Sequence, residues 1–83
     1  MSAVSTNEVR LKRVLSDIFG VPSEKIGDEA SVDDIETWDS LNHMKLVIAL
    51  ESEFSISFSE EQTVEIINLP LIKAVLSEHG VGF

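Results

Sequence analysis

Residues 39–54 read DSLNHMKLVIALESEF, and this stretch decides the fold class. Asp39 is a favourable N-cap, because its carboxylate can accept a hydrogen bond from an amide two or three residues further on. The apolar residues that follow recur at the spacing of one helical face. They are Leu41, Met44, Val47, Ile48, Leu50 and Phe54. The stretch therefore predicts an amphipathic helix over residues 40–54.

Upstream, the sequence predicts a helix over residues 6–19. Ser5 and Glu8 have the spacing of a capping box, which satisfies two amide donors at a helix start. Apolar residues then recur with helical spacing. Gly20 is a typical C-terminal stop, and Pro22 cannot continue the helix.

Downstream, two further helices are predicted, over residues 60–67 and 69–79. Ser59 and Gln62 repeat the capping-box spacing, and Asn68 is a third candidate cap. Five apolar residues of the last helix are expected to face a core: Leu69, Leu71, Ile72, Val75 and Leu76.

Residues 21–39 show no sustained period. A structureless loop of this length is unusual in a compact domain, so it is either pinned to the core or functional. Its candidate anchors are Val21, Ile26, Val32, Ile35 and Trp38. The whole pattern predicts one all-α domain over residues 1–83, a small four-helix bundle of three main helices and one short helix, with a long loop after the first.

Fifteen acidic against six basic residues give a formal net charge of −9. This charge repels phosphate, so it argues against nucleic acid and anionic membrane surfaces as partners. It favours partners with basic patches, although acidity that serves only solubility would explain the same composition. No apolar run approaches the roughly twenty residues of a membrane span, and residues 1–8 lack the pattern of a signal peptide. We therefore expect a cytoplasmic location. We also expect a monomer.

Metal sites are not predicted. The chain has no cysteine and only two histidines, which excludes disulfides, thiolate sites and His-rich sites. Six carboxylates lie between Asp28 and Asp39. They lack the alternating ligands, central glycine and terminal glutamate of a calcium loop.

Ser40 falls at the first position of the predicted helix 40–54. A phosphate ester there would face the positive end of the helix dipole and amides without helical partners. Serine is also common at helix starts, so its position alone does not assign a function. His43 lies three residues further on, which raises the alternative of a small serine hydrolase. We expect a surface histidine instead, because Asp39 is used as a cap and no glycine-rich turn supplies an oxyanion hole.

Several motifs together resemble the acyl and peptidyl carrier family. Asp39-Ser40-Leu41 resembles its DSL signature, and the preceding segment with two aspartates and an isoleucine, Asp33-Asp34-Ile35, matches the family as well. Residues 46–54, LVIALESEF, resemble the L-V-x-A-L-E-x-E-F ending of the family's second helix. Glu60-Glu61 resembles the opening of its third helix. The match runs from about residue 9 to residue 79, with helix and loop lengths in step.

The resemblance implies an acyl carrier protein with an acyl-carrier-type bundle and no catalytic activity of its own. A phosphopantetheinyl transferase would use coenzyme A and magnesium to attach a 4′-phosphopantetheine arm to Ser40. The thiol of the arm would carry an acyl group as a thioester, for acyl-loading and acyl-processing enzymes. The absence of cysteine is consistent with a reactive sulfur supplied by the cofactor. An unmodified carrier-like interaction module is the alternative.

The resemblance also implies that basic patches of partner enzymes dock on helix 40–54 and on the short helix. The residues that fit this role are Asp39, Leu41, Met44, Glu51, Glu53, Glu60, Glu61 and Glu65. Each glutamate is equally explained as part of a solvated helix face.

The sequence departs from the carriers of bacterial fatty-acid synthesis near Ser40. Asn42, His43 and Lys45 stand where those carriers typically have acidic residues, and Trp38 replaces a small residue. Ser55 replaces a turn residue such as glycine or aspartate. These departures favour a specialised stand-alone carrier, which would serve modified fatty acids, lipid or polysaccharide decoration, polyketides or an aminoacyl group.

Overall fold

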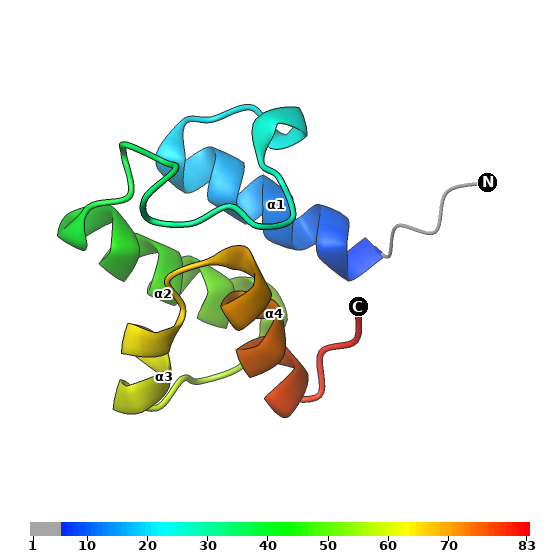
Figure 1. Cartoon of the computed structure of the whole chain (residues 1–83). Helices are drawn as coiled ribbons and strands as arrows, with labels where there is room; N and C mark the ends of the chain where they lie inside the picture. Colours follow the sequence, from blue (N-terminus) through cyan, green and yellow to red (C-terminus); the bar gives the residue numbers. More distant parts are fainter. Residues whose placement is uncertain (1–5) are drawn as a thin grey trace.

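The computed structural model describes residues 6–83, which form an all-α bundle (Figure 1). In chain order its elements are α1 (Thr6–Phe19), the 3₁₀ helix η1 (Ser23–Lys25), α2 (Ser40–Phe54), α3 (Glu60–Glu65) and α4 (Leu69–Glu78). No strand forms within this range apart from one isolated antiparallel bridge between Ser31 and Asn68. The prediction of three main helices, one short helix and a long loop after the first is confirmed.

Side-chain caps begin three of the helices. Asp39 Oδ1 accepts from the amide three residues further on at 2.9 Å, and Asn68 Oδ1 does the same at 2.8 Å. Ser59 and Gln62 form the predicted reciprocal capping box. These caps are confirmed, because each depends on residues within one helical turn. Ser5, which was predicted to cap α1, lies outside the described residues.

Two helices end earlier than predicted. α3 ends at Glu65 instead of residue 67, because Ile66 leaves the helical region at φ −81° and ψ 63°. The Ile67 carbonyl then accepts a hydrogen bond from the Val32 amide at 3.1 Å, which replaces a helical partner. α4 ends at Glu78, with His79 as its C-cap. The short helix η1 was not predicted.

The long loop is pinned to the junction between α3 and α4. Besides the bond from Val32 to Ile67, the Leu69 amide donates to the Ala30 carbonyl at 2.8 Å. Ile26, Ile35 and Trp38 are buried, as predicted for anchors of the loop. Val21 is only half-buried, although it packs against the core. Val32 is exposed, so its predicted role as an anchor is wrong.

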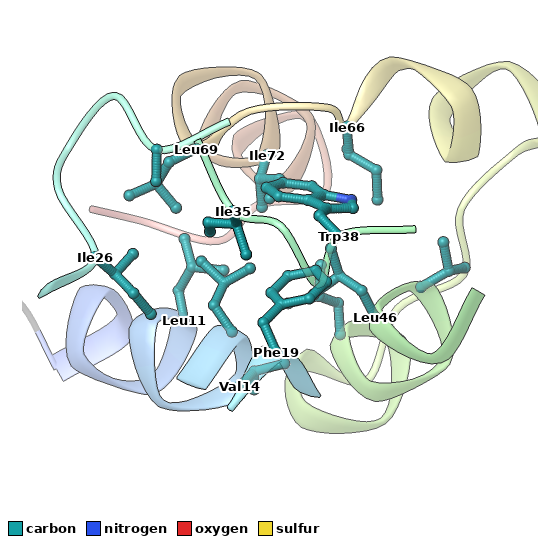
Figure 2. Close-up of a cluster of buried hydrophobic side chains, with 14 of the residues drawn as sticks. Leu11, Val14, Phe19, Ile26, Ile35, Trp38, Leu46, Ile66, Leu69 and Ile72 are labelled. Carbon is teal, nitrogen blue, oxygen red and sulfur yellow. The ribbon is translucent and has the colours of Figure 1, made fainter. Parts of the chain in front are cut away.

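The core lies between α1, α2, α4 and the loop, and Figure 2 shows the loop residues Ile26, Ile35 and Trp38 in the same cluster as helix side chains. Its buried members in the described range are Leu11, Val14, Leu15, Phe19, Ile26, Ala30, Ile35, Trp38, Leu46, Val47, Leu50, Ile66, Leu69, Ile72, Val75 and Leu76.

The predicted apolar stripe of α2 is wider than the face that the core covers. Leu41, Met44 and Ile48 are 66%, 55% and 63% exposed, whereas Val47 and Leu50 are buried. Leu71 of α4 is also exposed, so its predicted core position is wrong. The reason is geometric, since a helix at the surface of a two-layer bundle buries only one side. The exposed part of α2 is left available for contacts outside the bundle.

Ser55 ends α2 in the left-handed region, at φ 55° and ψ 50°. It is the one residue other than glycine with a positive φ in the described part of the chain. The left-handed conformation costs an L-residue about 1–2 kcal/mol, and glycine avoids that cost. Glycine also loses more chain entropy on folding, which offsets part of that gain. We therefore expect Ser55→Gly to raise the free energy of unfolding by about 1 kcal/mol. Urea denaturation followed by circular dichroism measures this.

Ser57→Gly is the matched control, because Ser57 is an exposed serine of the same link without a positive φ. That variant is expected to gain no stability. An equal midpoint shift in the two variants would contradict a strain at Ser55.

Candidate functional site

Ser40 is the first residue of α2 and is exposed. Within residues 6–83 the structure shows no hydrogen bond of its hydroxyl group. Asp39 is the N-cap of α2 and has an extended backbone, with φ −105° and ψ −178°, and its carboxylate accepts a hydrogen bond from the Asn42 amide. The Ser40 hydroxyl therefore stands at the positive end of the α2 dipole, where a phosphate group is well tolerated.

The segment before Ser40 is held to the end of α1. The Thr37 hydroxyl donates to the Phe19 carbonyl at 2.7 Å, and the Asn42 side-chain amide donates to the Thr37 carbonyl at 2.7 Å. Trp38 is only 4% exposed, and its ring stacks on Phe19 with 4.8 Å between centroids. Figure 2 shows the two side chains next to each other. The start of α2 is thus anchored on both sides of Ser40, so the serine is held on a rigid element.

An open groove of about 550 Å³ lies beside Ser40. Its lining is mostly apolar and comes from the loop, from α2, and from α3 with the segment after it. The lining residues, which we call the Ser40 groove, are Val32, Trp38, Asp39, Ser40, His43, Met44, Val64 and Ile67. A volume of this order is typical of sites for small ligands. Sequence patterns did not indicate the groove, because its walls come from three separate segments.

His43 differs from the expected surface histidine. It is half-buried, and its ring lies between two partners. Trp38 Nε1 is 3.0 Å from His43 Nδ1, and His43 Nε2 is 2.6 Å from the Thr63 carbonyl oxygen. An indole N–H only donates and a carbonyl only accepts, so the proton of the neutral ring is on Nε2. Both ring nitrogens are engaged away from Ser40, and the hydrolase alternative loses its base.

Two of the predicted recognition glutamates have partners inside the bundle. Glu51 Oε2 accepts from the Phe58 amide at 2.8 Å and thereby holds the link between α2 and α3. Glu53 pairs with Arg10 of α1, with 2.7 Å between Nε and Oε2. The sequence alone does not separate these roles from docking, because the partners lie seven and 43 residues away along the chain.

The other predicted recognition residues lie at the surface around the start of α2 and along α3. Asp39 is exposed next to Ser40, and the apolar Leu41 and Met44 follow on α2. On α3 the exposed carboxylates are Glu60, Glu61 and Glu65. Val64, which the sequence analysis did not single out, is 71% exposed among them. These elements thus carry exposed apolar residues, Leu41, Met44 and Val64, together with exposed carboxylates.

Neither a metal centre nor a membrane span is formed by residues 6–83. The structure brings no three potential His or carboxylate ligands of this range into one cluster. None of its helices there has both the length and the apolar character needed to cross a bilayer.

The model of a protein family described as "Phosphopantetheine attachment site" matches residues 9–74. The matched range takes in most of α1, the long loop, α2, α3 and half of α4. It therefore contains Ser40 with its cap, the Ser40 groove and the exposed surface of α2 and α3.

Proposed function

The chain belongs to the phosphopantetheine attachment family, whose model matches most of its length, and we propose that Ser40 is the residue that bears the arm. A member of this family is a carrier on which enzymes act and has no catalytic role itself. Its cofactor is covalent 4′-phosphopantetheine, and its partners include a phosphopantetheinyl transferase and enzymes that process the acyl group.

The surroundings of Ser40 fit that group. The hydroxyl is exposed and has no hydrogen-bond partner within the described residues, so a transferase can reach it. In the attachment, Ser40 Oγ loses its proton and bonds to the pyrophosphate phosphorus of coenzyme A that bears the pantetheine. The bond from this phosphorus to the bridging oxygen breaks, and adenosine 3′,5′-bisphosphate leaves. The new phosphate diester keeps one negative charge at the start of α2. When bound, the arm supplies the thiol that holds an acyl group as a thioester.

We further propose that the acyl group belongs to a specialised lipid, polyketide or related pathway. The support is the surface of α2 near Ser40. Lys45 is exposed there, whereas the side chains of Asn42 and His43 make hydrogen bonds to other residues of the chain. Partner docking would then depend on Leu41 and Met44. The acidic contribution would come mainly from α3, because the carboxylates of Glu51 and Glu53 already have internal partners. A cytoplasmic location and a monomeric state stay predictions of the sequence.

Intact-mass measurement tests the attachment. The protein is incubated with coenzyme A, magnesium and a phosphopantetheinyl transferase of broad specificity. We expect a mass gain of one phosphopantetheine group in the wild-type protein. An unchanged mass with several such transferases would contradict the proposal and would favour the unmodified interaction module.

Lys45→Glu tests whether the sign of the charge at position 45 selects the partner enzymes. The substitution changes a positive charge to a negative one on α2, close to the proposed docking surface. If the partners of fatty-acid synthesis dock through basic patches, kcat/KM for loading by their malonyl transferase should rise by about two- to tenfold. Lys25→Glu is the matched control, because Lys25 is an exposed lysine on η1. Equal rates for the Lys45 variant and the wild-type protein would contradict this interpretation.

A further inference from the structure

α3 contributes no buried side chain to the core, although its Val64 lines the Ser40 groove together with Ile67 of the segment that follows. Its own residues are half-buried at most, and Val64 and Glu65 are exposed. A helix of this length is marginal in water without tertiary contacts. On one side α3 is joined to the end of α4, where Gln62 Nε2 donates to Glu78 Oε1 at 3.1 Å and Gln62 Oε1 lies 3.0 Å from His79 Nε2. How closely α3 lies against α2 depends on the contacts that join those two helices.

One chain of hydrogen bonds makes that connection. The Trp38 indole N–H donates to His43 Nδ1, and the His43 Nε2–H donates to the Thr63 carbonyl. The Trp38 and His43 rings are also stacked, with 6.3 Å between centroids and 22° between planes. We call these three residues the clasp. It joins the loop, α2 and α3, which are the three segments that line the Ser40 groove.

The clasp also closes the way from Ser40 into the core. An apolar chain tethered to Ser40 would have to separate α3 from α2, which breaks the bond from His43 to Thr63 and leaves a half-buried N–H and carbonyl without partners. Behind that bond lies the buried indole of Trp38, packed on Phe19. Cores are filled at crystal-like density, so there is no room for a chain beside it unless the indole moves.

We infer that His43 is a positioning residue that fixes α3 through the clasp and so keeps the acyl cargo in the open Ser40 groove, outside the core. The inference rests on the proposed attachment at Ser40. The acyl group of this carrier then stays accessible to the processing enzymes at any chain length.

Hydrogen exchange of the unmodified protein tests the clasp without any arm. His43→Leu fills a similar volume but removes both hydrogen bonds, and we expect the amides of Thr63 and Val64 to exchange about tenfold faster. His43→Gln retains a side-chain N–H that can reach the Thr63 carbonyl, and it should recover most of the protection. Lys45→Leu is the control, because Lys45 is exposed on the same helix as His43 and lies outside the clasp. Equal exchange in His43→Leu and the wild-type protein would overturn the role of His43.

Thermal unfolding of the modified protein tests the fate of the cargo. Butyryl and dodecanoyl forms are compared, since a chain that enters the core stabilises the fold in proportion to the apolar area it buries. We expect the same Tm for the two forms in the wild-type protein and in His43→Gln. In His43→Leu the dodecanoyl form should have the higher Tm. A length-dependent Tm in the wild-type protein, or no length dependence in His43→Leu, would overturn the inference.

The two tests separate this inference from the proposed function. If Ser40 is not modified, no acyl form can be made and the proposed function fails, while the exchange experiment still reports on the clasp. If Ser40 is modified and the exchange is unaffected by His43→Leu, the proposed function stands and the clasp fails.

Discussion

Ser40→Ala is expected to abolish the mass gain of one phosphopantetheine group completely. Alanine has no oxygen to bond to the phosphorus, so the loss is all-or-none and does not depend on how strongly a transferase binds. The fold should survive, because Ser40 is exposed and its hydroxyl has no hydrogen bond within the described residues. A surface substitution of this kind changes the free energy of unfolding by about 0.5 kcal/mol or less. Circular dichroism checks this in the same samples.

Ser52→Ala is the matched control, since Ser52 is an exposed serine on the same helix. It should be modified to the same extent as the wild-type protein. A mass gain in Ser40→Ala would show that the arm is attached elsewhere, and a loss of the gain in Ser52→Ala would point to a general effect on docking.

Trp38→Ala is expected to have the largest effect on stability. The indole is buried, stacks on Phe19 and donates to His43. Removing a buried aromatic side chain typically costs about 3–5 kcal/mol, because the cavity does not fully collapse. A domain of 83 residues has a total stability of only roughly 4–12 kcal/mol. We therefore expect the variant to be unfolded in part even without denaturant.

Urea denaturation followed by far-ultraviolet circular dichroism measures this effect, because the substitution removes the one tryptophan of the chain and with it the usual fluorescence probe. Leu41→Ala is the control, since Leu41 is a large apolar residue that is mostly exposed. It should change the free energy of unfolding by about 0.5 kcal/mol or less. A Trp38→Ala variant as stable as Leu41→Ala would contradict the anchoring role of the indole.

Helix positions were predictable because their signals are local. The caps Asp39, Ser59 and Asn68 bond to amides three residues away, and apolar spacing within each helix reflects a period of 3.6 residues. The same locality explains why the start of α2 with Ser40 could be identified. The end of α3 was less predictable, because the Ile67 carbonyl takes a partner in the distant loop.

The roles of single side chains around the site were less predictable. His43 was expected at the surface, yet it bonds to Thr63, twenty residues away in the chain. Glu53 was grouped with docking residues, although its partner Arg10 is 43 residues away. Composition and spacing describe a side chain and its near neighbours. They carry no information about which distant polar group packs against it.

The sequence by itself determined the helix order, the helix starts and the motif around Ser40, because each depends on hydrogen bonds and apolar spacing within a few residues. Only the tertiary structure decided that Trp38, His43 and Thr63 form one hydrogen-bonded clasp beside Ser40. It also decided which apolar residues of α2 stay exposed. The physical reason is that a buried polar group needs a hydrogen-bond partner and an apolar face needs an apolar neighbour. Which residue takes that place depends on how the whole chain packs.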